Sequence, residues 1–111
     1  MPDPRYRPRD YLLHPKLFGL AETPALRAVA GIDELARARA SFAQAKRAYQ
    51  LRQLIAEFGL TQRELGAAIN LKPAKVSRLL NGDVTMSVED SSRFLNYFDG
   101  RRASSVSGEF D

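Results

Sequence analysis

The sequence predicts an all-α fold, a compact bundle of four to five helices with a helical N-terminal extension. Three observations lead to this prediction. Residues 33–58 are rich in the helix-forming residues Ala, Leu, Arg and Gln. Helix-start signals, in which a hydroxyl residue is followed three positions later by an acid, stand at residues 61–64 and 87–90. Asn70 and Gly82, residue types that suit helix ends, separate the helical stretches predicted after residue 61.

Composition limits the classes of protein to consider. The 111 residues fit one domain, and the formal net charge of +4 is a weak indication of a polyanionic partner. The absence of cysteine excludes disulfides and thiolate chemistry. No apolar run approaches the roughly 20 residues of a membrane helix, and the first ten residues lack the apolar stretch of a signal peptide. We therefore expect a cytoplasmic protein with no membrane association.

Catalysis has little support in the sequence. His14 is the only histidine, there is no glycine-rich phosphate loop, and no carboxylates cluster at metal-ligand spacing. Glu64 is explained by helix capping. We expect no enzymatic activity, no catalytic residue, no metal and no cofactor.

Residues 1–32 are predicted to form a basic arm and an N-terminal extension. The first ten residues contain three prolines and three arginines. They favour an extended arm, because proline fixes φ and removes a backbone donor; a tail without a role is an equal alternative. Thr23 and Pro24 then predict a short helix to about Ala30, ended by Gly31.

Residues 33–58 are predicted to form one long helix that ends at Gly59. Apolar residues at spacings of three and four mark one face of its first part, at Leu35, Ala38, Phe42, Ala45 and Tyr49. A second stripe, at Leu51, Leu54, Ile55 and Phe58, is out of phase with the first. Either the helix breaks near Ala48, or its two parts meet different neighbours. We favour the second, with the first part against residues 1–32 or a partner subunit.

Two short helices joined by a tight turn are predicted within residues 61–82. A capping box over residues 61–64 opens the first helix. Asn70 suits the left-handed conformation of a tight turn, and the second helix begins at Pro73 and ends at Gly82. This is a helix-turn-helix, in which the second helix enters the major groove of DNA and its N-terminal residues reach base edges.

A last helix is predicted from Ser87 to Gly100, with residues 101–111 as a flexible tail. Residues 33–100 then form the helical domain that contains the helix-turn-helix.

The stretch from Gly59 to Gly82 resembles the Cro/lambda-repressor-like (XRE) helix-turn-helix family. The matching residues are Gly59, Leu60, Thr61, Gln62, Glu64, Leu65, Val76, Ser77, Arg78, Asn81 and Gly82. The chain departs from the family pattern in the turn, where Asn70 replaces a common glycine. It also has apolar Ile55 and Leu80 where many members pair an arginine with an acid. Replacing both partners of an ion pair by apolar groups is chemically coherent, so we expect Ile55 and Leu80 to touch.

The resemblance implies two sets of DNA-contacting residues. The base-reading set is Lys72, Ala74, Lys75 and Arg78, among which Arg78 is the leading candidate, because arginine can donate to both O6 and N7 of guanine. The phosphate-binding set is Gln62, Arg63, Ser77, Asn81, Thr85 and Arg52. Each has a plainer alternative as a solvated surface residue, and for Arg52 the two are equal.

Three functions remain open at this point. The first is a dimeric transcriptional regulator, a repressor, that binds double-stranded DNA at an operator with two half-sites. The second is the antitoxin of a type II toxin–antitoxin pair that autoregulates its operon and binds its toxin through the N-terminal segment. The third is an interaction or architectural module that no longer reads sequence.

Overall fold

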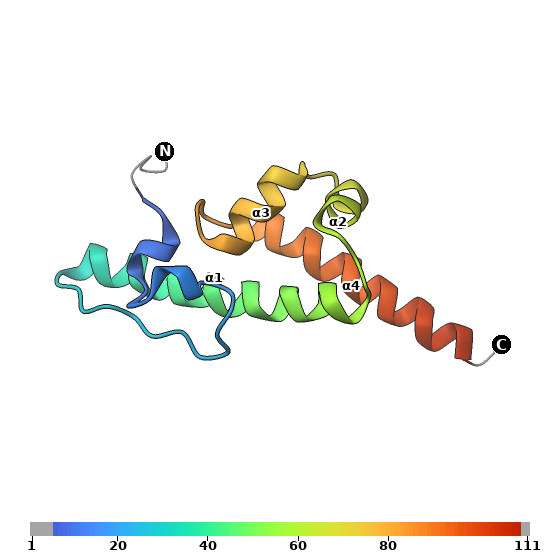
Figure 1. Cartoon of the computed structure of the whole chain (residues 1–111), viewed down its shortest axis with the longest axis horizontal. Coiled ribbons are helices and arrows are strands. Elements are labelled where there is room, and N and C mark those ends of the chain that lie inside the picture. Colours follow the sequence, from blue (N-terminus) through green and yellow to red (C-terminus); the bar gives the residue numbers. More distant parts are fainter. Residues whose placement is uncertain (1–5, 110–111) are drawn as a thin grey trace.

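The computed structural model describes residues 6–109, with side chains up to Arg102. Its elements are two short 3-10 helices, η1 (Pro8–Tyr11) and η2 (Pro15–Leu17), and four α-helices, α1 (Ile32–Glu57), α2 (Gln62–Ile69), α3 (Pro73–Asn81) and α4 (Val88–Glu109). Figure 1 shows α2 and α3 lying together on one side of α1, with α4 crossing the bundle and extending beyond it. The prediction of an all-α bundle is confirmed. None of the described helices is long and apolar enough to cross a membrane.

Helix α1 is a single helix of 26 residues, so the predicted long helix is confirmed. Its first half packs against η1 and its second half against α3. Its buried side includes Ala38 and Ala45 of the predicted stripe. It departs from the prediction in that Leu35 is exposed while Ser41, Gln44 and Ala48 are buried. Small and polar side chains line this side, and they let the N-terminal segment approach the helix closely.

The N-terminal segment, residues 6–31, is built differently from the prediction. Residues 6–10 are no extended arm, since Pro8 is buried at the start of η1; residues 1–5 lie outside the described part. The helix predicted from Pro24 to Ala30 is also wrong. Instead, the backbone of residues 25–27 runs antiparallel to that of residues 11–13, with a bridge between Leu12 and Leu26. Long-range backbone pairing has overridden the local helix-start signal, and Gly31 precedes α1 rather than ending a helix.

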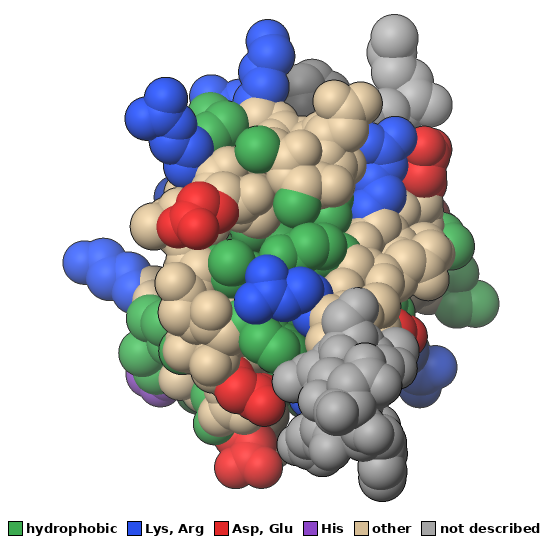
Figure 2. Space-filling view, turned by 90° about the vertical axis from the view of Figure 1, so that its right-hand side faces the viewer, with side chains coloured by type: hydrophobic (Ala, Val, Ile, Leu, Met, Phe, Trp, Pro, Cys, Tyr) green, Lys and Arg blue, Asp and Glu red, His purple; other side chains and the backbone are tan. Residues whose placement is uncertain are grey.

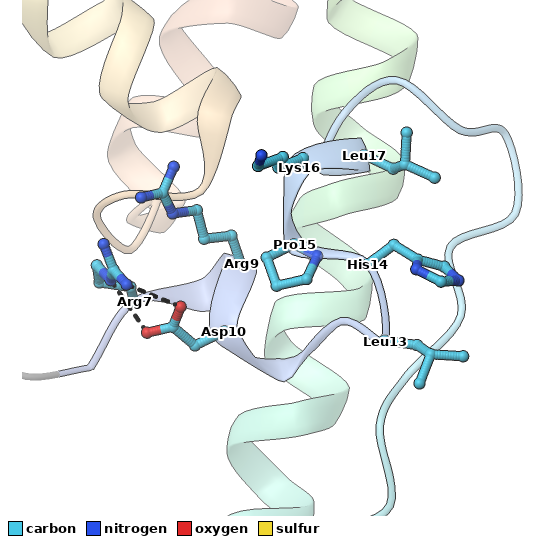
Figure 3. Close-up of a pocket in the computed structure, with 8 residues that line it drawn as sticks. All are labelled: Arg7, Arg9, Asp10, Leu13, His14, Pro15, Lys16 and Leu17. Atoms are coloured by element: carbon cyan, nitrogen blue, oxygen red, sulfur yellow. Dashed lines mark hydrogen bonds and ion pairs between the residues drawn. The ribbon is translucent and has the colours of Figure 1, made fainter.

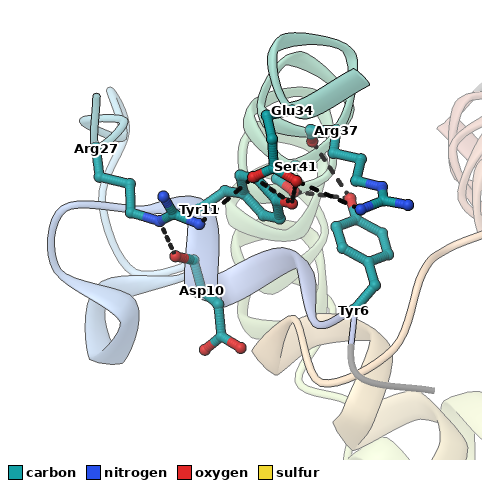
Figure 4. Close-up of polar contacts among 7 residues, drawn as sticks. All are labelled: Tyr6, Asp10, Tyr11, Arg27, Glu34, Arg37 and Ser41. Carbon is teal, nitrogen blue, oxygen red and sulfur yellow. Dashed lines mark hydrogen bonds and ion pairs between the residues drawn. The ribbon is translucent and has the colours of Figure 1, made fainter. Parts of the chain in front are cut away.

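Polar contacts of two tyrosines fasten this segment to α1 (Figure 4). The hydroxyl of Tyr6 lies 2.8 Å from Ser41 Oγ. The hydroxyl of Tyr11 donates to both carboxylate oxygens of Glu34, at 3.0 and 3.1 Å. Burial raises the pKa of Tyr11, so its hydroxyl keeps the proton it donates. Arg27 stacks on the Tyr11 ring, with its charged carbon 4.7 Å from the ring centre.

One hydrophobic core joins all these elements. Its fully buried large side chains come from α1, α2, α3 and α4, namely Leu51, Leu65, Val76, Leu79, Leu80, Phe94 and Phe98. Phe18 and Leu12 of the N-terminal segment belong to the same core. The described part of residues 1–32 therefore packs into the same core as the α-helices.

Helix α4 begins as predicted, with the Ser87 hydroxyl accepting from Asp90 N at 3.0 Å. It does not end at Gly100 but continues to Glu109, where a flexible tail was expected; residues 110–111 lie outside the described part. A glycine costs a helix only about 1 kcal/mol, and no proline follows it. Arg101 also packs on the rings of Phe58 and Tyr97, which supports the helix just past the glycine.

Candidate nucleic-acid interface

The start of α2 is set by the predicted capping box. Thr61 Oγ1 accepts from Glu64 N at 3.0 Å, and the Glu64 carboxylate accepts from Thr61 N at 3.2 Å. This pairing satisfies two backbone donors that a helix start leaves without partners. Gln62 and Arg63, expected to contact phosphate, occupy the first two positions of the helix; Arg63 is exposed and Gln62 is half-buried.

The turn between α2 and α3 has the predicted left-handed residue. Asn70 has a φ of 61°, and Leu71 N donates to Gly66 O at 2.8 Å. Gly66 makes this tight turn possible, because a Cβ there would lie 2.5 Å from Leu71 O. Gly66 was not among the residues predicted to matter, although a glycine inside a short helix is itself a signal of close backbone approach.

Helix α3 presents the predicted base-reading residues on its outer side. Val76, Leu79 and Leu80 are fully buried against the core. The four predicted residues lie at the start of the helix and on the part of its surface that faces away from the core. Lys72, Ala74 and Arg78 are exposed, and Lys75 is half-buried. Within the described part of the chain, Lys72, Lys75 and Arg78 make no ion pair, so their charges are available to a ligand.

Lys and Arg side chains project from the side of the molecule that carries α2 and α3. Figure 2 shows Lys and Arg side chains projecting from the upper edge of the view, the side on which these two helices lie in Figure 1. A helix of this kind fits the major groove of B-DNA, and cations beside it meet the phosphates that line the groove.

The C-terminal end of α3 is held by a chain of side chains that starts on α1. Arg52 Nη2 donates to Asn81 Oδ1 at 2.6 Å, and Asn81 Nδ2 donates to Ser77 Oγ at 3.2 Å. Burial lowers the pKa of Arg52, and its Nε is buried with no hydrogen-bond partner in the described structure. Three residues predicted to bind phosphate are thus brought together, with Arg52 directed inward. The fourth residue near this end, Thr85, is exposed.

Gln44 is the main positioning residue that was not predicted from the sequence. It is buried on α1, and its Nε2 donates to Leu79 O at 3.1 Å and to Val84 O at 2.9 Å. Its Oε1 accepts from Met86 N at 2.9 Å. One side chain therefore fixes both the end of α3 and the loop that follows. The only sign of this role in the sequence was an amide side chain among small residues on one face of the predicted helix.

The paired apolar replacement at positions 55 and 80 fits the structure. Leu80 is fully buried, and Ile55 is half-buried against the core cluster that contains Leu80. Both positions thus belong to the apolar core, and the direct contact between the two side chains stays a prediction.

Comparison with known families agrees with this geometry. A family model described as helix-turn-helix matches residues 51–102. Over these residues the chain is similar to the Cro/C1-type (XRE) helix-turn-helix family, which confirms the resemblance seen in the sequence. It is accordingly a DNA-binding protein of the transcription-regulator class. Comparison with curated proteins and with solved structures found no match.

Proposed function

We propose that the protein is a sequence-specific repressor that binds an operator with two half-sites as a homodimer. The observation that carries the proposal is the outer side of α3, where Lys72, Lys75 and Arg78 make no ion pair within the described chain while the opposite side is buried. A single helix of nine residues reaches few base pairs. Two copies on a symmetric site are the usual way to gain affinity and specificity.

The proposal divides the contacts between bases and backbone. Arg78 reads a guanine through O6 and N7, Ala74 contacts a thymine methyl, and Lys72 and Lys75 bind a base edge or a phosphate. Phosphates are bound by the remaining predicted residues, Gln62, Arg63, Ser77, Asn81 and Thr85. Arg52 acts on this set indirectly, because its guanidinium holds the Asn81 side chain.

Selection of bound sequences from random DNA tests the function directly. We expect an enriched motif of two related half-sites. Arg78→Ala should then weaken operator binding by about 1–3 kcal/mol and relax the preference at one position per half-site. A matched change on the outer side of α1, Arg39→Ala, should leave the motif unchanged. Equal losses on operator and random DNA for Arg78→Ala would contradict its base-reading role.

An antitoxin is the second candidate function, and one observation favours it. Leu13, Leu17 and Leu20 of the N-terminal segment are 57, 48 and 58% exposed, which is unusual for three leucines in one short segment. In this alternative they bind a toxin encoded beside the protein. Co-expression with the product of each neighbouring small reading frame, followed by co-purification, tests the alternative. Binding that survives replacement of all three leucines by serine would count against this surface.

A further inference from the structure

The N-terminal segment lies directly against the C-terminal end of the recognition helix α3. Arg9 N donates to Gly82 O at 3.0 Å. The ring of Phe18 covers Gly82 so closely that a Cβ there would lie 2.7 Å from it. A Cβ on Gly19 would lie 2.7 Å from Leu80 O. Residues 7–19 are therefore in direct contact with the last residues of α3 and with the glycine that ends it.

Negative charge lies at the end of α3 that the N-terminal segment covers. The C-terminus of a helix carries partial negative charge, and Asp83 adds a carboxylate beside it. Arg9 Nη1 lies 3.2 Å from Asp83 Oδ1. The hydrogen bond with Asp10 raises the pKa of Arg7, and Asp83 contributes a weaker attraction to the same guanidinium. Arg9 thus pairs with this acid, while Arg7 beside it is held by Asp10 through two hydrogen bonds of 3.0 Å.

A cavity of about 680 Å³ opens at this place, lined by Arg7, Arg9, Asp10, Leu13, His14, Pro15, Lys16 and Leu17. Figure 3 shows its two sides: the charged ends of Arg7, Arg9 and Lys16 lie toward the loop after α3, whereas Leu13, His14 and Leu17 point the other way. Lys16 is exposed and makes no hydrogen bond or ion pair within the described residues. The cationic side is the one that faces the loop after α3.

We propose that Arg9 and Lys16, with Arg7 beside them, form a second phosphate-binding surface for the DNA that α3 reads. This rests on the proposed function, because the occupant is the backbone of the same duplex beyond the base pairs read by α3. A DNA backbone fits better than an acidic protein segment, since the cations flank a helix that itself enters DNA. The surface adds affinity without sequence information.

The test measures the DNA affinity of the full chain as a function of salt concentration. The variant R9A/K16A removes two charges from the cavity, and R39A/K46A removes two from exposed positions of α1 on the side away from the core. Removing one bound phosphate should flatten the slope of log K against log salt by about 0.9 per protomer. We expect R9A/K16A to flatten the slope and to weaken binding roughly three- to tenfold for each phosphate released at low salt, equally on operator and random DNA. R39A/K46A should match the wild type.

Two further variants separate structural damage from weaker phosphate binding. K16A removes a side chain without partners in the described structure, so it should flatten the slope without lowering the melting temperature. Asp83→Asn frees Arg9 and removes the acid, and it should tighten binding. An unchanged slope in both R9A/K16A and K16A would overturn the proposal and leave an acidic protein segment as the occupant.

The outcomes distinguish this proposal from the proposed function. If R78A abolishes sequence preference while R9A/K16A keeps the wild-type slope, the second surface is wrong and the regulator stands. If R9A/K16A flattens the slope on DNA that the wild type binds without preference, the surface is supported and sequence-specific repression is wrong.

Discussion

Arg52 on α1 and Asn81 at the end of α3 are joined by a hydrogen bond of 2.6 Å, and the same guanidinium reaches Leu80 O at 3.5 Å. The contact places a cation at the negative end of the recognition helix. Because Asn81 in turn donates to Ser77, the long helix α1 sets the orientation of polar side chains of α3 that lie outside the core.

Arg52→Ala should lower the free energy of unfolding by about 1–2 kcal/mol, because it leaves Asn81 Oδ1 without its donor in a partly buried place. Urea denaturation measures the change. Arg39→Ala, which removes an exposed arginine of the same helix, should change the stability by less than about 0.5 kcal/mol. Equal effects of the two substitutions would show that the contact between α1 and α3 is not stabilising.

Gln44→Ala should be more damaging, lowering the free energy of unfolding by about 2–4 kcal/mol. It leaves two carbonyls and one amide, at Leu79, Val84 and Met86, without their partner in the interior. The matched control is Gln53→Ala, an exposed glutamine of the same helix. Denaturation curves that overlap for the two variants would refute the positioning role of Gln44.

Gly66→Ala should destabilise the fold by about 1–3 kcal/mol, although alanine favours a helix, because the new Cβ would press on Leu71 O. Gly100→Ala is the opposite case. Apart from its chain neighbours and the nearby backbone of its own helix, no described atom lies within 4 Å of a Cβ at that position. The gain in helix propensity should therefore stabilise by about 0.5–1 kcal/mol. Thermal melts of both variants test the pair, and the prediction fails if the two shifts have the same sign.

Asn70→Ala should cost about 1 kcal/mol, since the left-handed conformation is strained for a residue with a Cβ and without a local amide. Asn70→Gly should be neutral or slightly stabilising. The contacts of Arg93 with this turn go to backbone carbonyls, so both substitutions retain them. A melting temperature lowered equally by alanine and glycine would point instead to a role of the amide side chain.

The parts of the structure that the sequence predicted are those decided within three or four residues. The capping box at Thr61, the left-handed turn at Asn70 and the end of α3 at Gly82 depend on local hydrogen bonds and local φ preferences, and the structure confirms them. These local signals predicted that α1, α2 and α3 follow one another along the chain.

The parts that were wrong or missed depend on residues far apart in the chain. No local pattern indicates that residues 25–27 will pair with residues 11–13, or that Gln44 will bind the loop after α3. The buried stripe of α1 was right at Ala38 and Ala45 but wrong at Leu35, for the same reason. Leucine and phenylalanine were expected inside, but the N-terminal segment needed small side chains where it packs on α1. The roles of the predicted DNA-contacting residues stay predictions.

The backbone bond from Arg9 to Gly82 has a consequence for folding. It joins a segment before α1 to the loop after α3, so the cooperative unit is larger than the family match over residues 51–102. A fragment cut to that match would lack Gln44 and Phe18, and its recognition helix would end in a frayed loop. Contacts of such high sequence separation also slow folding, and Gly82 O at the end of α3 gains its donor only when the N-terminal segment docks.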